Sequence, residues 1–280
     1  MKPIGKQGQC KLCLEVKDLC ESHIIPKHVY KRNGIWTKKE KVHTLHTTND
    51  YEFINSHTIT DKSWKGERED RFLCRDCEIR LNVFEQYVVD IFFEEITPKK
   101  YKVVASESMT PIGRAIAFTG VDYHKLKLYY LSIFWRMSLS TLPLFDYFKL
   151  SPFDNERIRQ MIFNNDAGKD EQFEIALFRP GVGDLPTKVL APFLIKPISN
   201  GTGYYIIGAF GANGILLKLS DGGVFEEPFK NIMQYTSLKN EKTVYISIIP
   251  DEEWKFFIYN TLRVGEILDA QLQMNGKNNF

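Results

Sequence analysis

Two Cys-x-x-Cys pairs constrain the fold of this chain more than any other feature of its sequence: Cys10 with Cys13, and Cys74 with Cys77. Each pair is able to place two sulfur atoms on one side of a metal ion, and a tetrahedral zinc ion takes four such ligands. We therefore predict one structural zinc site that joins the two pairs. Residues 14–73 separate the pairs by more than a compact zinc module requires, so we expect an inserted β element between them.

The composition indicates a folded protein with reduced cysteines. Hydrophobic residues make up 43% of the 280 residues, as in ordinary globular proteins. No apolar leader opens the sequence, and charged Lys127 and Arg136 interrupt its most apolar stretch, so we expect a cytoplasmic protein without membrane contact. Its cysteines suit metal ligation better than disulfides. The fifth one, Cys20, is expected to be a small buried residue, with exchange for one of the four ligands as the alternative.

The polarity of the chain changes near residue 100. Residues 1–100 hold all five cysteines and five of the six histidines. Their polar, turn-forming composition leaves little for an independent core, and metal coordination supplies folding free energy to such segments. We therefore predict an α+β protein with a zinc-bound N-terminal module, residues 1–100, followed by a mixed helix and antiparallel-sheet region, residues 101–280.

The spacing of apolar residues predicts the helices. Apolar side chains recur at helical intervals over residues 79–92, so the second cysteine pair should open a long helix. We expect a largely buried helix over residues 123–140 and a shorter one, N-capped by Asp154, that ends near residue 162. A last helix is expected over residues 252–262.

Short β-rich runs between turn residues predict the strands of the C-terminal region. These runs cover residues 173–178, 204–210, 215–219 and 243–249. The glycines between Gly201 and Gly214 match neither nucleotide-binding spacing, so we interpret them as hairpin turns.

The interval between the cysteine pairs contains a histidine that we expect to enter a short apolar strand closed by proline, Glu21-Ser22-His23-Ile24-Ile25-Pro26-Lys27. A Cys-x-x-Cys pair, this segment and a Leu-Cys-x-x-Cys that opens a helix together resemble the HNH, or ββα-metal, endonuclease family in its zinc-stapled treble-clef form. The resemblance covers residues 10–82. Four segments also resemble a narrower group of largely uncharacterised bacterial HNH endonuclease-like proteins: residues 22–27, 65–70, 73–78 and 131–136.

The resemblance implies roles for three residues. In that family the strand histidine, here His23, is the general base that takes a proton from the attacking water, which suits imidazole because its pKa lies near neutral pH. The residue after the last zinc cysteine, here Glu78, commonly binds a divalent ion, Mg²⁺ or Mn²⁺, that neutralises charge developing on the phosphate. Asn82 follows one helical turn later on the same face and is expected to assist.

Ser22 departs from the family pattern, in which this position is often a metal-binding aspartate. A hydroxyl is a poorer Mg²⁺ ligand than a carboxylate, and neighbours in a regular strand point to opposite faces. The structural alternative is a packed histidine at His23 and an exposed first-turn carboxylate at Glu78. Three more histidines are expected in loops, with the supply of a missing ligand as their alternative role: His43, His46 and His57.

A basic run that contains only one acid, Glu40, follows the histidine segment, with Tyr30 and Trp36 between the cations. Such a run attracts phosphates through counterion release, and aromatic rings stack on unpaired bases; a solvated loop is the alternative. The net charge of +2 does not by itself indicate a polyanion partner. We therefore predict local nucleic-acid contacts at Lys27, Lys31, Arg32, Lys38, Lys39 and Lys41.

Two functions follow from these patterns. The first is a metal-dependent endonuclease that hydrolyses phosphodiester bonds, in DNA rather than RNA, with structural Zn²⁺ and catalytic Mg²⁺ or Mn²⁺; the resemblance suggests a role in bacterial defence. The alternative is a catalytically inactive zinc scaffold that binds nucleic acid or protein, which Ser22 favours. Residues 101–280 show no nucleophile constellation, and we expect them to bind a protein partner or a second copy of the chain, or to select the substrate.

Overall fold

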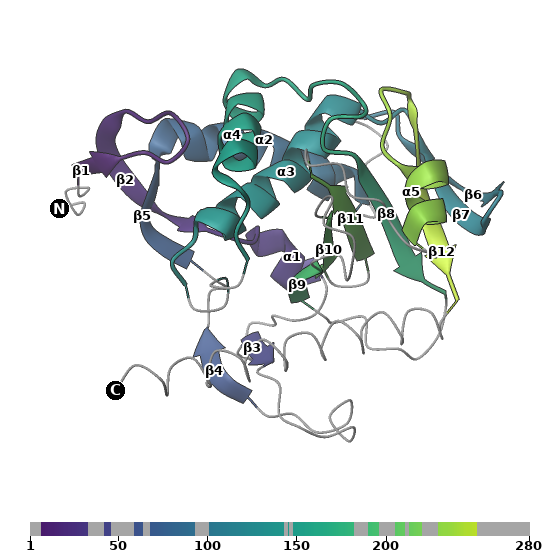
Figure 1. Cartoon of the computed structure of the whole chain (residues 1–280), viewed down its shortest axis with the longest axis horizontal. Coiled ribbons are helices and arrows are strands. Elements are labelled where there is room, and N and C mark those ends of the chain that lie inside the picture. The colour runs from purple at the N-terminus through teal and green to yellow at the C-terminus, as the bar shows by residue number, and fades with distance from the viewer. Residues whose placement is uncertain are drawn as a thin grey trace.

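The computed structural model describes residues 7–32, 42–45, 59–63, 68–92, 101–142, 145, 148–181, 190–195, 205–210, 213–219 and 229–250. Figure 1 shows that a small sheet and a large sheet flank a central group of helices. The helix predicted over residues 252–262 lies outside the described residues. Within them, no helix combines the length and the apolar character that crossing a bilayer requires.

Three antiparallel strands and two helices make up the N-terminal part. In chain order these are β1 (Gln7–Gln9), β2 (Val16–His23), α1 (Lys27–Arg32), β5 (Arg68–Cys74) and α2 (Arg75–Phe92). The strands are adjacent in the order β1-β2-β5. Helix α2 begins directly after β5, and its buried side chains, among them Leu81, Phe84 and Val88, lie on one face. The prediction of a long helix at the second cysteine pair is confirmed.

The inserted β element between the cysteine pairs is also confirmed. It consists of β3 (Val42–Leu45) and β4 (Ile59–Ser63), which pair antiparallel. His43 lies in β3 opposite Lys62, so the prediction of a loop at this histidine is wrong. His46 and His57 lie outside the described residues.

The pairing of β2 with β5 is irregular near the end of β2. Cys20 pairs with Leu73 and Ser22 with Glu69, so β5 bulges between these two pairs. Arg71 within the bulge adopts a left-handed backbone with a φ of 56°. The bulge breaks the in-and-out alternation of the strand, and Ser22 is completely buried as a result.

The prediction that a strand continues after His23 is wrong. Strand β2 ends at His23, and Ile24 and Ile25 form a bend in which both side chains are buried. A regular strand would point successive side chains to opposite faces, whereas the bend directs both into the core. The Val29 amide then donates to the Pro26 carbonyl at 3.0 Å in the first turn of α1.

Seven strands of the C-terminal region form one sheet. They are β6 (Val104–Thr110), β7 (Gly113–Thr119), β8 (Ile175–Pro180), β9 (Leu190–Ile195), β10 (Tyr205–Phe210), β11 (Asn213–Lys218) and β12 (Thr243–Ile249). Their order is β6-β7-β12-β8-β11-β10-β9. Strands β12 and β8 run parallel, so the sheet is mixed rather than antiparallel throughout.

The four predicted strands of this region are confirmed as β8, β10, β11 and β12, with small shifts at their ends. Phe210 pairs with Asn213, which confirms a tight hairpin within the glycine-rich segment. Strand β6 was not predicted because it is polar and largely exposed along its length, and its neighbour β7 lacks a simple alternation.

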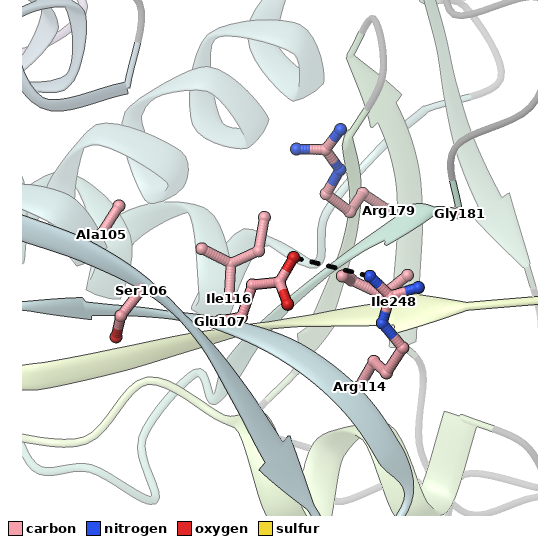
Figure 2. A pocket seen from close by; sticks show the side chains of 8 residues that line it. All are labelled: Ala105, Ser106, Glu107, Arg114, Ile116, Arg179, Gly181 and Ile248. Carbon is pink, nitrogen blue, oxygen red and sulfur yellow. Dashed lines mark ion pairs between the residues drawn. The ribbon is translucent and has the colours of Figure 1, made fainter.

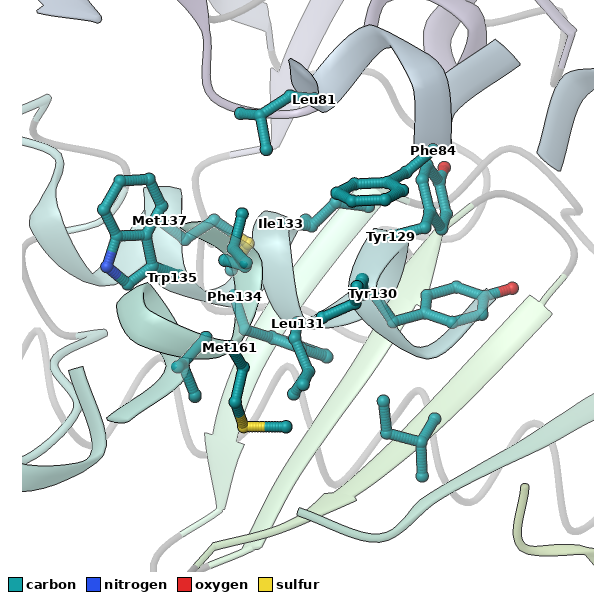
Figure 3. Close-up of a cluster of buried hydrophobic side chains, with 14 of the residues drawn as sticks. Leu81, Phe84, Tyr129, Tyr130, Leu131, Ile133, Phe134, Trp135, Met137 and Met161 are labelled. Carbon is teal, nitrogen blue, oxygen red and sulfur yellow. The ribbon is translucent and has the colours of Figure 1, made fainter. Parts of the chain in front are cut away.

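Helix α3 (Tyr123–Leu139) lies at the centre of the core and is buried on nearly all sides. Asp122 caps it, accepting a hydrogen bond from the Lys125 amide at 3.1 Å. Figure 3 shows side chains of α3 beside Leu81 and Phe84 of α2. One continuous hydrophobic cluster contains residues of the N-terminal part, of α3 and of the large sheet, so the cysteine-containing segment shares its core with the rest of the chain.

Two further helices cover this core. Helix α4 (Pro152–Asn164) packs against α3, and α5 (Phe229–Thr236) packs against β8 and β12. The prediction of Asp154 as the N-cap of α4 is wrong, because Ser151 caps the helix and its Oγ accepts from the Asp154 amide at 3.0 Å. Pro152 fits the first helical position, where no amide donor is needed.

We expect Leu131→Ala to destabilise the protein by about 2–5 kcal/mol, because Leu131 is fully buried in α3 and the substitution leaves a cavity. Urea denaturation followed by circular dichroism measures this change. Val83→Ala on α2, where the side chain is 51% exposed, is the control and should change the free energy of unfolding by less than about 1 kcal/mol. Equal effects of the two substitutions would contradict the central position of α3.

Candidate metal centre

The four paired cysteines converge on one point. Their Sγ atoms all lie within 4.8 Å of one another, and the Sγ atoms of Cys13 and Cys74 are 3.9 Å apart. A tetrahedral zinc ion with Zn–S bonds of about 2.3 Å separates its sulfur ligands by about 3.8 Å. Cys10, Cys74 and Cys77 are buried, and Cys13 is half-buried. The predicted convergence of the two pairs is therefore confirmed, and the donor set suits zinc.

A tight turn between β1 and β2 presents the first pair. The Cys10 carbonyl accepts from the Leu14 amide at 2.9 Å, and the Cys10 amide donates to the Glu15 carbonyl at 2.9 Å. Leu14 reverses the chain with a left-handed φ of 64°. The reversal keeps both sulfurs of the Cys10 and Cys13 pair on the same side of the turn.

The junction of β5 and α2 presents the second pair. Cys74 is the last residue of β5, and Cys77 lies in the first turn of α2. The Cys74 amide donates to the Cys10 sulfur at 3.3 Å, which links the two pairs directly. Free amides at a helix N-terminus favour a thiolate, so this junction suits the ionised sulfurs that a metal ion requires.

The thiols perturb one another strongly. A hydrogen bond from the Cys77 thiol lowers the pKa of Cys10 to about 4; burial opposes this, and the amides of Cys13, Cys74 and Leu12 add to it. The same hydrogen bond, together with burial, raises the pKa of Cys77. The first thiolate therefore disfavours the ionisation of its neighbour, and a divalent cation at the centre removes this conflict.

The fifth cysteine lies outside this group. Cys20 is half-buried, and burial raises the pKa of its thiol. The prediction that it is not one of the four clustered thiols is confirmed, although it is less buried than expected.

Helix α4 supports the turn of the first pair from the C-terminal region. Arg159 Nη1 donates to the Leu12 carbonyl at 2.6 Å, and two of its nitrogens bind Glu156, each at 2.7 Å. The Lys11 amide also donates to the Phe72 carbonyl at 3.1 Å. The backbone between Cys10 and Cys13 is thus held by both β5 and α4.

The other predicted site residues lie on β2 and α2, the strand and the helix that the two cysteine pairs adjoin in sequence. His23 ends β2 and is half-buried, and Glu78 follows Cys77 in the first turn of α2. Asn82 is exposed one turn further along the helix. Glu78 contributes to raising the pKa of Cys20 on β2, after the larger effect of burial, so its charge acts toward the strand that carries His23.

Two buried oxygen atoms on this strand and helix have no hydrogen-bond partner among the described residues: Ser22 Oγ and Glu78 Oε1. Leaving such an atom unpaired costs about 1–3 kcal/mol, so these atoms are rarely retained without a ligand, water or ion to bind. Both belong to positions that the sequence associates with a divalent ion. The bulge in β5 interrupts the regular pairing beside Ser22, whose hydroxyl is buried.

The described residues do not complete a second cluster of metal ligands. In this part of the chain, the four cysteines are the one group of three or more His, Cys, Asp or Glu side chains with converging ligand atoms. Among the residues it describes, the structure therefore places neither Glu78 nor His23 in a group of three or more converging ligands of these types. Any divalent ion at Glu78 would keep most of its coordination shell as water.

Half of the predicted nucleic-acid contacts fall within the described residues. Lys27, Lys31 and Arg32 lie on the short helix α1, directly after the His23 strand. On the same helix, His28 Nε2 and the Tyr129 hydroxyl are hydrogen-bonded at 2.8 Å, which fixes α1 to α3. The other three contacts lie outside the described residues: Lys38, Lys39 and Lys41.

Comparison with known proteins gives no relative on which to base a function. No protein-family model, curated protein or solved structure matches this chain. A relation to the HNH family is therefore a hypothesis, and it rests on the order of motifs in this sequence.

Sequence reasoning missed two charged residues beside this site, Glu85 of α2 and Arg136 of α3. Arg136 is 2% exposed, and its Nη1 lies 2.9 Å from both Glu85 Oε1 and the His23 carbonyl. The available signal was a lone arginine in an apolar helix, which implies a buried partner. That partner lies far away in sequence, so the pattern alone did not identify it.

A pocket of about 250 Å³ lies elsewhere, on β6, β7, β8 and β12. Figure 2 shows Glu107 of β6 directed toward Arg114 of β7, with which it forms an ion pair at 3.7 Å. Arg179 lies on β8, and strand β12 separates β8 from β7. None of its lining residues belongs to the cysteine cluster or to the region of His23.

We expect the purified protein to contain about one zinc ion per chain, measured by elemental analysis. Cys74→Ser should abolish zinc binding and lower the melting temperature by roughly 5 °C or more, because four-thiolate coordination contributes to folding. Cys20→Ser is the matched control and should retain full zinc content. Zinc-free native protein, or equal zinc loss in both variants, would contradict the assignment.

Proposed function

We propose that residues 10–82 form a treble-clef, ββα-metal module of the HNH type and that the protein is a metal-dependent endonuclease. The observation that carries this proposal is the order of elements: a cysteine turn, β2, β5 and α2, with the two cysteine pairs at the ends of this unit. His23 is the last residue of β2, and Glu78 lies in the first turn of α2. The family resemblance assigns the general base and a metal ligand to these two positions.

The roles of the chain's own groups follow from this arrangement. The imidazole of His23 accepts a proton from the attacking water. Glu78 would hold Mg²⁺ or Mn²⁺ through Oε1, which is buried without a hydrogen-bond partner among the described residues, and Asn82 would assist from the next turn. When bound, that ion supplies positive charge to the scissile phosphate and the leaving oxygen. A single carboxylate suffices for Mg²⁺ when water and substrate phosphate complete its shell.

The basic residues of α1 provide the contact to the substrate in this proposal. Lys27, Lys31 and Arg32 follow His23 by only a few residues in the sequence, so the proposal assigns to them the attraction of phosphates near the base. We propose DNA as the substrate, and we propose a role in bacterial defence on the resemblance alone.

The second candidate function is a zinc scaffold that binds nucleic acid or protein without cleaving it. Ser22 in place of the usual aspartate favours this function, as does the absence of Glu78 from any group of three or more converging ligands among the described residues. In that case the unpaired oxygens bind water, and the zinc serves only the fold.

Incubation with plasmid, single-stranded DNA and RNA, in Mg²⁺, Mn²⁺ or EDTA, distinguishes the two functions. For the endonuclease we expect cleavage that requires a divalent ion. His23→Ala should slow it by about 10²–10⁴-fold because a general base is lost, and Glu78→Gln should weaken the metal dependence. The controls are His124→Ala and Glu107→Gln, which alter exposed residues of the same types elsewhere.

Binding without cleavage under every metal condition would instead support the scaffold. If His23→Ala cleaves at the rate of the native protein, His23 is not the general base. The protein would still be an endonuclease, with another residue in that role.

Ser22→Asp offers a test of the divalent ion site that does not require activity. Under the endonuclease proposal, a second carboxylate beside Glu78 should lower the Kd for Mn²⁺ on the order of tenfold, measured by calorimetry or electron paramagnetic resonance. Ser22→Ala removes the unpaired hydroxyl and should leave the Kd unchanged. If Ser22→Asp is folded, retains zinc and binds Mn²⁺ no more tightly than the native protein, no divalent ion lies at this position.

A further inference from the structure

We propose that Arg136 of α3 is a positioning residue for His23, through which residues 101–280 complete the proposed nuclease site. This inference rests on the proposed function, and it assigns to the C-terminal region a part in the reaction that its own sequence motifs do not suggest.

The guanidinium of Arg136 connects three elements at one point. Its Nη1 donates to the His23 carbonyl at 2.9 Å, at the end of β2, and forms an ion pair with Glu85 Oε1 on α2 at 2.9 Å. Its Nε donates to the Ser132 carbonyl at 3.2 Å, on its own helix. The end of β2, the middle of α2 and helix α3 are therefore fixed relative to one another by one buried side chain.

The contact of Arg136 is with the main chain of His23, so it acts on the direction of the side chain rather than on the ring. A carbonyl held in place fixes the peptide plane that follows the histidine, and pairing with β5 holds the backbone before it, so the two together restrict the direction of the Cα–Cβ bond. Among the described residues, the ladder between β2 and β5 ends at the pair His23 and Arg68, and the hydrogen bond from Arg136 lies just beyond it, on the C-terminal side of His23.

The other partner of Arg136 lies on the face of α2 that carries the proposed metal ligand. Glu78 and Glu85 are two helical turns apart and lie on the same side of α2. Burial raises the pKa of the Glu85 carboxyl, the charge of Arg136 opposes this rise, and Glu78 adds to it. The guanidinium thus binds both the strand of the proposed base and the helix face of the proposed metal ligand.

Stability alone does not account for this arrangement. Removing a guanidinium and a carboxylate from water costs several kcal/mol, and well-packed apolar residues often replace such a pair without loss of stability. What the pair provides is fixed geometry, since the planar guanidinium donates in set directions to several acceptors at once. Lysine keeps the charge but lacks these directions.

Arg136→Lys is the principal test. We expect zinc content to be retained and kcat for plasmid cleavage to fall by about 10- to 100-fold with little change in KM, because a base displaced by about 1 Å loses that much. Lys127→Met is the matched control: Lys127 lies on the same helix, is 1% exposed, and binds Tyr123 and Lys169 rather than β2. Its kcat should stay within about twofold of the native value.

A double-mutant cycle separates positioning from a general effect on the fold. If Arg136 acts through His23, adding Arg136→Lys to His23→Ala should cause no further loss of cleavage. Full multiplication of the two effects would overturn the proposal, as would an unchanged kcat in Arg136→Lys.

A second readout does not depend on cleavage, so failure of the proposed function remains distinguishable from failure of this inference. With selectively labelled histidine, and His23→Ala to assign the signal, the NMR chemical shift of the His23 ring should change in Arg136→Lys and not in Lys127→Met. Should Arg136→Lys fail to fold, Glu85→Gln weakens the same anchor and should shift the His23 signal in the same direction. An unshifted signal in the folded variant means that Arg136 does not position His23, whether or not the protein cuts DNA.

Discussion

The convergence of four cysteine sulfurs is the contact on which the N-terminal third of this protein depends. The first pair closes the turn between β1 and β2, and the second joins β5 to α2, so one cluster ties the start of β2 to the end of β5 at one end of the three-stranded sheet. The small sheet has few buried side chains of its own, and sulfur–metal coordination is suited to hold what apolar packing cannot. His23 lies at the other end of β2, where Arg136 binds its carbonyl.

The features that sequence identified best are those with a local physical signature. Two x-x-spaced cysteine pairs have few uses other than a metal site, and the apolar periodicity of α2 and α3 extends over many turns. Strand β12 was predicted with its correct bounds because Pro250 and the polar residues before Thr243 delimit it. The N-cap of α4 was misplaced because Ser151 and Asp154 both suit a cap, and only the preceding chain direction decides between them.

The features that sequence missed depend on contacts between distant segments. The bulge opposite Cys20 and Ser22 lies in β5, about fifty residues away, so the inward turn of Ser22 had no local sign. The contacts of Arg136 with Glu85 and His23 were missed for the same reason, since they join residues that are far apart in the sequence. Strand β6 was not predicted because it lies at the edge of the sheet and carries polar residues on both faces, so its sequence lacks an apolar alternation.

The shared core also limits how this chain can be divided. Leu81 and Phe84 of α2 pack in the same cluster as Trp135 of α3 and Met161 of α4, and Arg159 reaches across to the backbone beside Cys13. A fragment cut near residue 100 would expose that apolar face of α2 to water and would lose the clamp on its cysteine turn. Residues 10–92 are therefore not expected to fold on their own. If they were fused to another protein, that protein would have to supply the contacts that α3 and α4 make here.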